Sequence, residues 1–222
     1  MADKIKLHPE IPHKKRVFEI ADRLRAGDVM LFPSDTRYAL GCDLHNKKGI
    51  DKIRQIRKLD KNHLFTLITD SLAGISRFAN LSDENFKLIK RLIPGPYTFI
   101  LPATKEVPRL LLHPSRKTIG FRVPDHPICE AIVSELGEPL VATSAKMPEE
   151  HHNGQEVHYP DDLFHLFDKF VELVIDDEQP LQHKDSTMID FTSGQPEIIR
   201  KGSGFEKVEE VFLSQNVAFS VE

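Results

Sequence analysis

Small hydroxyl side chains stand together at three places in this 222-residue chain, each next to an apolar run. The three sets are Ser34 with Thr36, Thr143 with Ser144, and Ser186 with Thr187. Hydroxyl groups at strand ends can both donate and accept hydrogen bonds, so they suit a small polar ligand. A turn alone also explains residues 33–41, because Pro, Ser, Asp and Gly favour turns. The repetition at three strand ends favours one ligand pocket.

Two arginines, Arg122 and Arg200, stand on predicted strands and add positive charge to these hydroxyl groups. Alternation along residues 118–123 places Thr118, Gly120 and Arg122 on one face of a strand. That face is either a row of ligand-facing residues or the exposed face of an edge strand. Hydroxyl and guanidinium donors together would suit an anionic ligand, such as a nucleotide or an amino-acid carboxylate.

The net charge of −4 argues against a protein wholly dedicated to nucleic acid. The charge is unevenly distributed, however, because residues 149–178 are acidic and residues 47–61 are basic. The basic residues are Lys47, Lys48, Lys52, Arg54, Arg57, Lys58 and Lys61. They could bind phosphate groups, or they could form the solvated face of a helix.

Several other classes of protein are disfavoured by the sequence. There is no GxxxxGK[ST] motif, and Gly202-Ser203-Gly204 is too short for a dinucleotide-binding fingerprint. No apolar run approaches the roughly 20 residues of a membrane span, so we expect no membrane association. The histidines at 151, 152 and 158 lack the spacing of metal ligands, so we expect no fixed metal site. Cys42 and Cys129 form no CxxC motif, which favours a cytoplasmic location.

Predicted strands alternate with predicted helices along the chain, which indicates an α/β fold with mixed parallel and antiparallel pairing. We expect helices at 13–25, 47–58, 127–136, 161–170 and 206–213, and two short ones capped by Ser71 and Ser82. Strands are expected at 28–32, 64–68, 97–102, 118–123, 140–142 and 172–175, with a hairpin of 187–191 and 197–200. Asp125 is the expected cap of helix 127–136, and residues 149–160 are expected to form a mobile loop.

Five motifs together resemble the YrdC/YciO family, and they occur in the order of that family. They are Pro33-Ser34-Asp35-Thr36-x-Tyr38-x-Leu40-Gly41, Pro94-Gly95-Pro96-Tyr97-Thr98, Thr118-Ile119-Gly120-Phe121-Arg122-Val123-Pro124, Ala142-Thr143-Ser144-Ala145 and Ser186-Thr187-x-x-Asp190. The resemblance covers residues 12–204 as one YrdC-like domain, with an N-terminal segment at 1–11 and a C-terminal helix and tail at 205–222. It implies a twisted open mixed sheet, flanked by helices, around a large central cavity.

The resemblance also implies a function. Members of this family bind double-stranded RNA or tRNA and nucleotides such as ATP and AMP. The best-known members make L-threonylcarbamoyl-AMP from L-threonine, bicarbonate and ATP, for the threonylcarbamoyladenosine modification of tRNA. Mg²⁺ would enter with ATP, and the expected state is a monomer or a weak dimer.

Residue roles follow from the same resemblance. The residues expected to bind the substrate are Ser34, Thr36, Arg122, Ala142 and Ser186. Those expected to bind the nucleotide are Arg57, Lys61, Thr118, Ser144 and Arg200. The expected catalytic residues are Arg57, Ser144 and Lys146, and the expected RNA-binding residues are Arg54, Arg57 and Lys58.

The chain departs from the synthases at three positions, and there it resembles the YciO branch. Active synthases have Lys-x-Arg where this chain has Arg57-x-Leu59, and Ser-x-Asn where it has Ser144-x-Lys146; His63 replaces a further lysine. Loss of a phosphate-facing guanidinium costs on the order of 2–4 kcal/mol of transition-state stabilisation. We therefore expect RNA and nucleotide binding with a weak synthase rate. The alternatives are a fully competent synthase and a non-catalytic module that binds ribosomal RNA.

Overall fold

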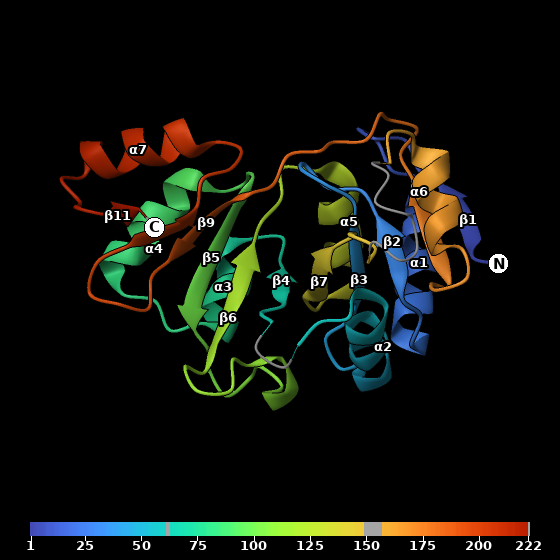
Figure 1. Cartoon of the computed structure of the whole chain (residues 1–222), viewed down its shortest axis with the longest axis horizontal. Coiled ribbons are helices and arrows are strands. Elements are labelled where there is room, and N and C mark those ends of the chain that lie inside the picture. The colour runs from blue at the N-terminus through green and yellow to red at the C-terminus, as the bar shows by residue number, and fades with distance from the viewer. Residues whose placement is uncertain (61–62, 149–156, 222) are drawn as a thin grey trace. The chain divides into compact units, whose positions relative to one another are not determined.

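The computed structural model describes residues 1–60, 63–148 and 157–221 (Figure 1). The chain forms two compact units, which we describe separately. Unit 1 contains Met1–Asp60 and His126–His183, and unit 2 contains Lys61–Asp125 and Lys184–Glu222. Lys61 and most of the predicted loop at 149–160 lie outside the described residues.

Unit 1 is built on strands in the order β1-β8-β2-β3-β7. The strands are β1 (Asp3–Lys6), β2 (Met30–Phe32), β3 (Ala39–Asp43), β7 (Leu140–Ser144) and β8 (Leu173–Asp176). Strand β8 runs parallel to β1 and β2, whereas β3 runs antiparallel to β2 and β7. The helices are α1 (Lys14–Ala26), α2 (Lys47–Arg57), α5 (Pro127–Leu136) and α6 (Pro160–Phe167).

Local sequence explains the ends of these helices. Gly27 ends α1 in the left-handed conformation, with φ of 112°, which suits a residue without a Cβ atom. The Asn46 side chain caps α2 by accepting a 2.8 Å hydrogen bond from the Gly49 N–H. Pro127 stands in the first turn of α5, where its missing N–H costs nothing. Helices α1 and α5 pack against each other, and α2 packs against β3.

Unit 2 contains strands in the order β4-β6-β5-β9-β10-β11. The strands are β4 (Thr66–Ile68), β5 (Tyr97–Pro102), β6 (Thr118–Arg122), β9 (Thr187–Asp190), β10 (Glu197–Arg200) and β11 (Ser220–Val221). The helices are α3 (Leu72–Phe78), α4 (Asp83–Leu92) and α7 (Phe205–Ser214), with a 3₁₀ turn at Arg109–Leu111. Helix α4 packs against α7 (Figure 1).

The predicted mixed α/β fold is confirmed, and so are the Ser71 and Ser82 caps and the hairpin of β9 and β10. Two predictions of local structure were wrong, and one of the two alternatives for residues 118–123 is excluded. Strand β7 continues to Ser144, so its hydroxyl pair lies within the strand. Helix α5 is preceded by His126, which makes no side-chain cap bond, and Asp125 is not its cap. Strand β6 lies between β4 and β5, so it is not an edge strand.

Strands β1, β3 and β11 were not predicted. Within the described residues, each helix is too short or too polar to cross a membrane.

Candidate functional site

The Ser34–Thr36 turn connects β2 to β3 in unit 1, and its hydroxyl groups hold the turn together. The Ser34 hydroxyl donates to the Arg37 carbonyl over 2.6 Å. The Ser34 oxygen also accepts from the Thr36 N–H, and it lies 3.3 Å from the Thr36 hydroxyl oxygen. Both side chains are buried. The turn that the sequence suggested is therefore present, and it fixes both hydroxyl groups at one place.

Strand pairing brings the end of β7 beside this turn. Ala39 pairs with Ser144 in the antiparallel register of β3 and β7, and Gly41 pairs with Ala142. One residue further on, the Ala145 N–H donates a 2.9 Å hydrogen bond to the Tyr38 carbonyl. The Ser34–Thr36 turn and the Ser144–Lys146 segment therefore belong to one continuous wall of unit 1. Ala142 lies deeper in the strand and is buried.

Arg57, at the end of α2, reaches the same wall. Its Nη1 atom donates a hydrogen bond to the Lys146 carbonyl. Its Nε atom is buried and has no hydrogen-bond partner, and no described carboxylate lies within ion-pair distance of it. Burial lowers the pKa of this guanidinium, since a charged group is less stable away from water. A guanidinium in this state has unused capacity to bind an anion.

The other residues of the basic region differ in exposure. Lys47, Lys48 and Lys58 are exposed on α2 and at its end. Lys52 pairs with Glu172, whose pKa is lowered: burial would raise it, but the Lys52 contact outweighs that effect. Arg54 is half-buried and donates to the Asp60 carbonyl over 3.1 Å.

Unit 2 brings two of the predicted residues into direct contact. Arg200 donates from Nε to the Ser186 carbonyl and from Nη2 to the Ser186 hydroxyl oxygen, both over 3.0 Å. The Ser186 and Thr98 hydroxyl oxygens lie 2.8 Å apart. Thr118 and Arg122 lie on β6 and are buried, and the Thr118 hydroxyl has no hydrogen-bond partner. Thr98 stands in a motif quoted above, but no role was predicted for it.

A cavity of about 520 Å³ adjoins this contact in unit 2. It is lined by Arg200, Lys184, Lys201 and the Gly202–Gly204 segment, among others. Arg200 therefore faces a depression of mixed charge, which Asp185 and Glu206 also line, while Ser186 fixes its guanidinium from one side.

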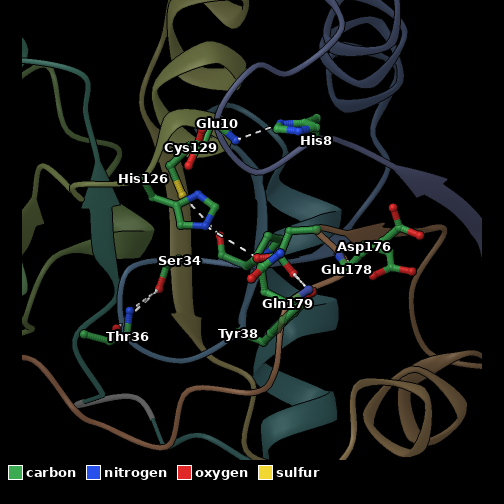
Figure 2. Close-up of polar contacts among 12 residues, drawn as sticks. His8, Glu10, Ser34, Thr36, Tyr38, His126, Cys129, Asp176, Glu178 and Gln179 are labelled. Carbon is green, nitrogen blue, oxygen red and sulfur yellow. Dashed lines mark hydrogen bonds and ion pairs between the residues drawn. The ribbon is translucent and has the colours of Figure 1, made fainter.

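Sequence reasoning missed a polar cluster in unit 1, formed by Tyr38, His126 and Asp177. The Tyr38 hydroxyl donates to the Asp177 carboxylate over 2.8 Å, and His126 Nε2 lies 3.7 Å from that carboxylate. The Gln179 N–H also donates to it, over 3.3 Å. Figure 2 shows Tyr38, His126 and Gln179 gathered near the Ser34–Thr36 turn. Only a weak signal pointed to this cluster, since Asp177 stands in an acidic run.

Charge in this cluster is concentrated on Asp177. Burial alone would raise the pKa of its carboxyl, but His126, Tyr38 and the Gln179 N–H hold that pKa below its usual range. Burial also raises the pKa of the Tyr38 phenol, and the Asp177 charge raises it further. The two groups therefore form an ionised carboxylate with a neutral phenol donor.

Comparison with known proteins identifies the family. The Sua5/YciO/YrdC family model, described as "Telomere recombination", matches residues 22–202. The chain belongs to this family, which confirms the resemblance of its motifs.

Among curated relatives, YciO of Escherichia coli K12, itself uncharacterized, is 38% identical over 198 residues, which cover 89% of this chain and 94% of the relative. A threonylcarbamoyl-AMP synthase of Vibrio vulnificus is 29% identical over 132 residues, which cover 58% of this chain and 70% of the relative.

Solved structures show the same fold. The crystal structure of E. coli YciO matches with a TM-score of 0.86 and covers 94% of this chain and 99% of that one. P. abyssi Sua5 complexed with L-threonine matches with a TM-score of 0.83 at 23% identity. That match covers 98% of this chain and 62% of the Sua5 chain, and at this identity it supports the fold alone.

Proposed function

We propose that this protein binds a nucleotide and a small carboxylic acid on the wall of Arg57, Ser144 and the Ser34–Thr36 turn, and that it forms the threonylcarbamoyl adenylate only slowly. The observation that supports this most directly is the half-buried Arg57 side chain, whose Nε atom is buried without a hydrogen-bond partner and which has no counter-ion among the described residues. A partly buried charge without a counter-ion is costly, and a bound phosphate or carboxylate would remove part of that cost.

The weak rate follows from the neighbours of Arg57. In the synthase reaction, a threonine-derived carbamate attacks the α-phosphate of ATP, and pyrophosphate leaves. Positive charge around the phosphates supplies much of the stabilisation in such reactions. Leu59 supplies none, and the exposed Lys146 ammonium is a point charge that does not replace a planar guanidinium or an amide.

RNA is the second proposed partner, and the exposed cations of α2 support it. Lys47, Lys48 and Lys58 are accessible, and Arg54 lies on the same helix. Arg57 differs from them, since its guanidinium is turned onto the Lys146 carbonyl. We therefore assign Arg57 to the small-molecule wall, and Arg54 and Lys58 to the RNA surface.

Calorimetric titration with AMP tests the nucleotide part of this proposal. Arg57→Gln removes the charge and should weaken AMP binding by about 10-fold or more, since a charge-assisted contact is lost. Arg16→Gln is the matched control, because Arg16 is exposed on α1 and its only ion pair among the described residues is with Glu19. Equal AMP affinity in wild type and Arg57→Gln would contradict the role of Arg57.

A further inference from the structure

Thr98 lies on β5 in unit 2, two hydrogen-bonding contacts away from Arg200, and its own role is open. Strand β5 pairs with β6 on one side and with β9 on the other, so the backbone of Thr98 is fixed within the sheet. The residue is buried, with only 5% of its surface exposed. The Thr98 hydroxyl group therefore has a defined position, set by a strand that is paired on both sides.

The Thr98 hydroxyl group holds the side chain of Ser186. The two hydroxyl oxygens lie 2.8 Å apart, and both side chains are buried. A serine side chain has three staggered rotamers, and this contact favours the one in which the Ser186 oxygen also meets Arg200. Because the contact is buried, loss of the Thr98 hydroxyl would leave Ser186 with an unsatisfied polar group.

Ser186 in turn holds one edge of the Arg200 guanidinium. Nε donates to the Ser186 carbonyl and Nη2 donates to the Ser186 hydroxyl oxygen, each over 3.0 Å. These two nitrogens form one donor edge of the planar group, and Nη1 with the second Nη2 proton forms the other. Arg200 has no ion pair with a described carboxylate. The Ser186 contacts therefore leave the second edge for bidentate binding of an anion.

The cavity of about 520 Å³ in unit 2 separates the roles of these three residues. Arg200 contributes to its lining, whereas Ser186 and Thr98 do not. A ligand in this cavity would meet the guanidinium but neither of the two hydroxyl groups. Thr98 therefore influences such a ligand only through Ser186 and Arg200.

We propose that Thr98 is a positioning residue for nucleotide binding by Arg200: through the Ser186 hydroxyl group, it orients the guanidinium for a phosphate. This inference rests on the nucleotide binding of the proposed function. An arginine side chain that is mobile before binding loses rotamer freedom when it binds a phosphate, and this loss lowers the affinity. Contacts that hold the guanidinium in place beforehand reduce the loss. Thr98 therefore changes the affinity without changing the charge.

The test combines two measurements on the full chain: calorimetric titration with AMP, and nitrogen NMR relaxation of the Arg200 Nε–H group without ligand. Thr98→Val removes the hydroxyl group and keeps the branched shape. We expect it to weaken AMP binding by about 3- to 10-fold and to make the Arg200 Nε–H group more mobile. Thr98→Ser keeps a hydroxyl group and should restore both. Unchanged Arg200 relaxation in folded Thr98→Val would overturn the proposal.

Thr104→Val is the matched control, because it removes another threonine hydroxyl of unit 2, which donates to the Arg77 carbonyl over 3.0 Å. It should change neither measurement, and amide spectra show whether each variant retains the fold.

A double variant tests whether Thr98 acts through Ser186. Thr98→Val added to Ser186→Ala should weaken AMP binding no further than Ser186→Ala alone, and additive losses would overturn the proposal. If wild type binds AMP and folded Thr98→Val binds it equally well, the role of Thr98 is wrong. If wild type does not bind AMP, the proposed function itself is wrong, and the nucleotide role of Arg200 is wrong with it.

Discussion

The Tyr38 hydroxyl donates a 2.8 Å hydrogen bond to the Asp177 carboxylate, although the two residues lie 139 positions apart in the chain. This bond joins the residue just before β3 to the residue just after β8. Because the carboxylate is buried and ionised, the hydrogen bond is charge-assisted and stronger than one between neutral groups.

Tyr38→Phe removes this donor and should lower the free energy of unfolding by about 1.5–3 kcal/mol, since the buried carboxylate loses a hydrogen bond. Urea unfolding followed by circular dichroism measures the change. Tyr159→Phe is the control, because Tyr159 is 70% exposed, and this variant should match wild type. Equal stability of Tyr38→Phe and wild type would show that the hydrogen bond adds nothing.

The lowered pKa of Asp177 predicts how stability depends on pH. A carboxyl group whose pKa is lower in the folded state stabilises the fold above its unfolded pKa of about 3.9, and this contribution is lost as pH falls through the folded value. Wild type should therefore lose stability more steeply below about pH 4 than Asp177→Asn does. The measurement is urea unfolding at a series of pH values. Parallel curves for the two proteins would contradict the shift.

The parts of the fold that could be predicted from the sequence are those marked by local signals. Helices α3 and α4 were placed by their Ser71 and Ser82 caps. Strand β1 was missed because only Ile5 of its four residues is buried, and pairing with β8 holds it in place. In β3, Gly41 gives no strand signal, yet an added Cβ atom would lie 2.7 Å from the Phe32 ring.

The candidate site, too, was predicted from the sequence only where the signal is local. The Ser34–Thr36 turn was identified from local residue types. The contact between Arg57 and the Lys146 carbonyl was not predicted, because it joins residues 89 positions apart. The cluster of Tyr38, His126 and Asp177 was missed for the same reason. Contacts of this kind depend on strand order and register, which periodicity does not give.

Two glycines have a positive φ but differ in the space around them. Alanine substitutions at the two positions therefore distinguish the cost of backbone strain from the cost of a steric clash. Gly204 and Gly137 have φ values of 75° and 74°. A Cβ atom at Gly204 would lie 2.6 Å from the Tyr97 hydroxyl oxygen, whereas a Cβ atom at Gly137 would meet nothing within 4 Å. Gly137→Ala should cost about 1 kcal/mol of unfolding free energy, and Gly204→Ala a further 1–3 kcal/mol or so. Equal losses in urea unfolding would show that Tyr97 moves aside without cost.

The salt dependence of binding tests the proposed RNA surface on α2. Arg54→Gln with Lys58→Gln should weaken binding of a double-stranded RNA and reduce the slope of log affinity against log salt by about 1 or more. Lys87→Gln with Lys90→Gln is the matched control, because both lysines are exposed on α4. An equal loss in both double variants would mean that RNA binding does not depend on α2.

The proposed nucleotide wall lacks the guanidinium and the amide that synthases carry at the positions of Leu59 and Lys146. The most direct measurement is threonine-dependent release of pyrophosphate from ATP, with Mg²⁺ and bicarbonate present. Wild type should be slow, and Leu59→Arg with Lys146→Asn should raise the rate by about 10- to 1,000-fold, whereas Leu59→Met with Lys146→Met should not. Rapid threonine-dependent turnover by wild type, unchanged by Leu59→Arg with Lys146→Asn, would contradict the account.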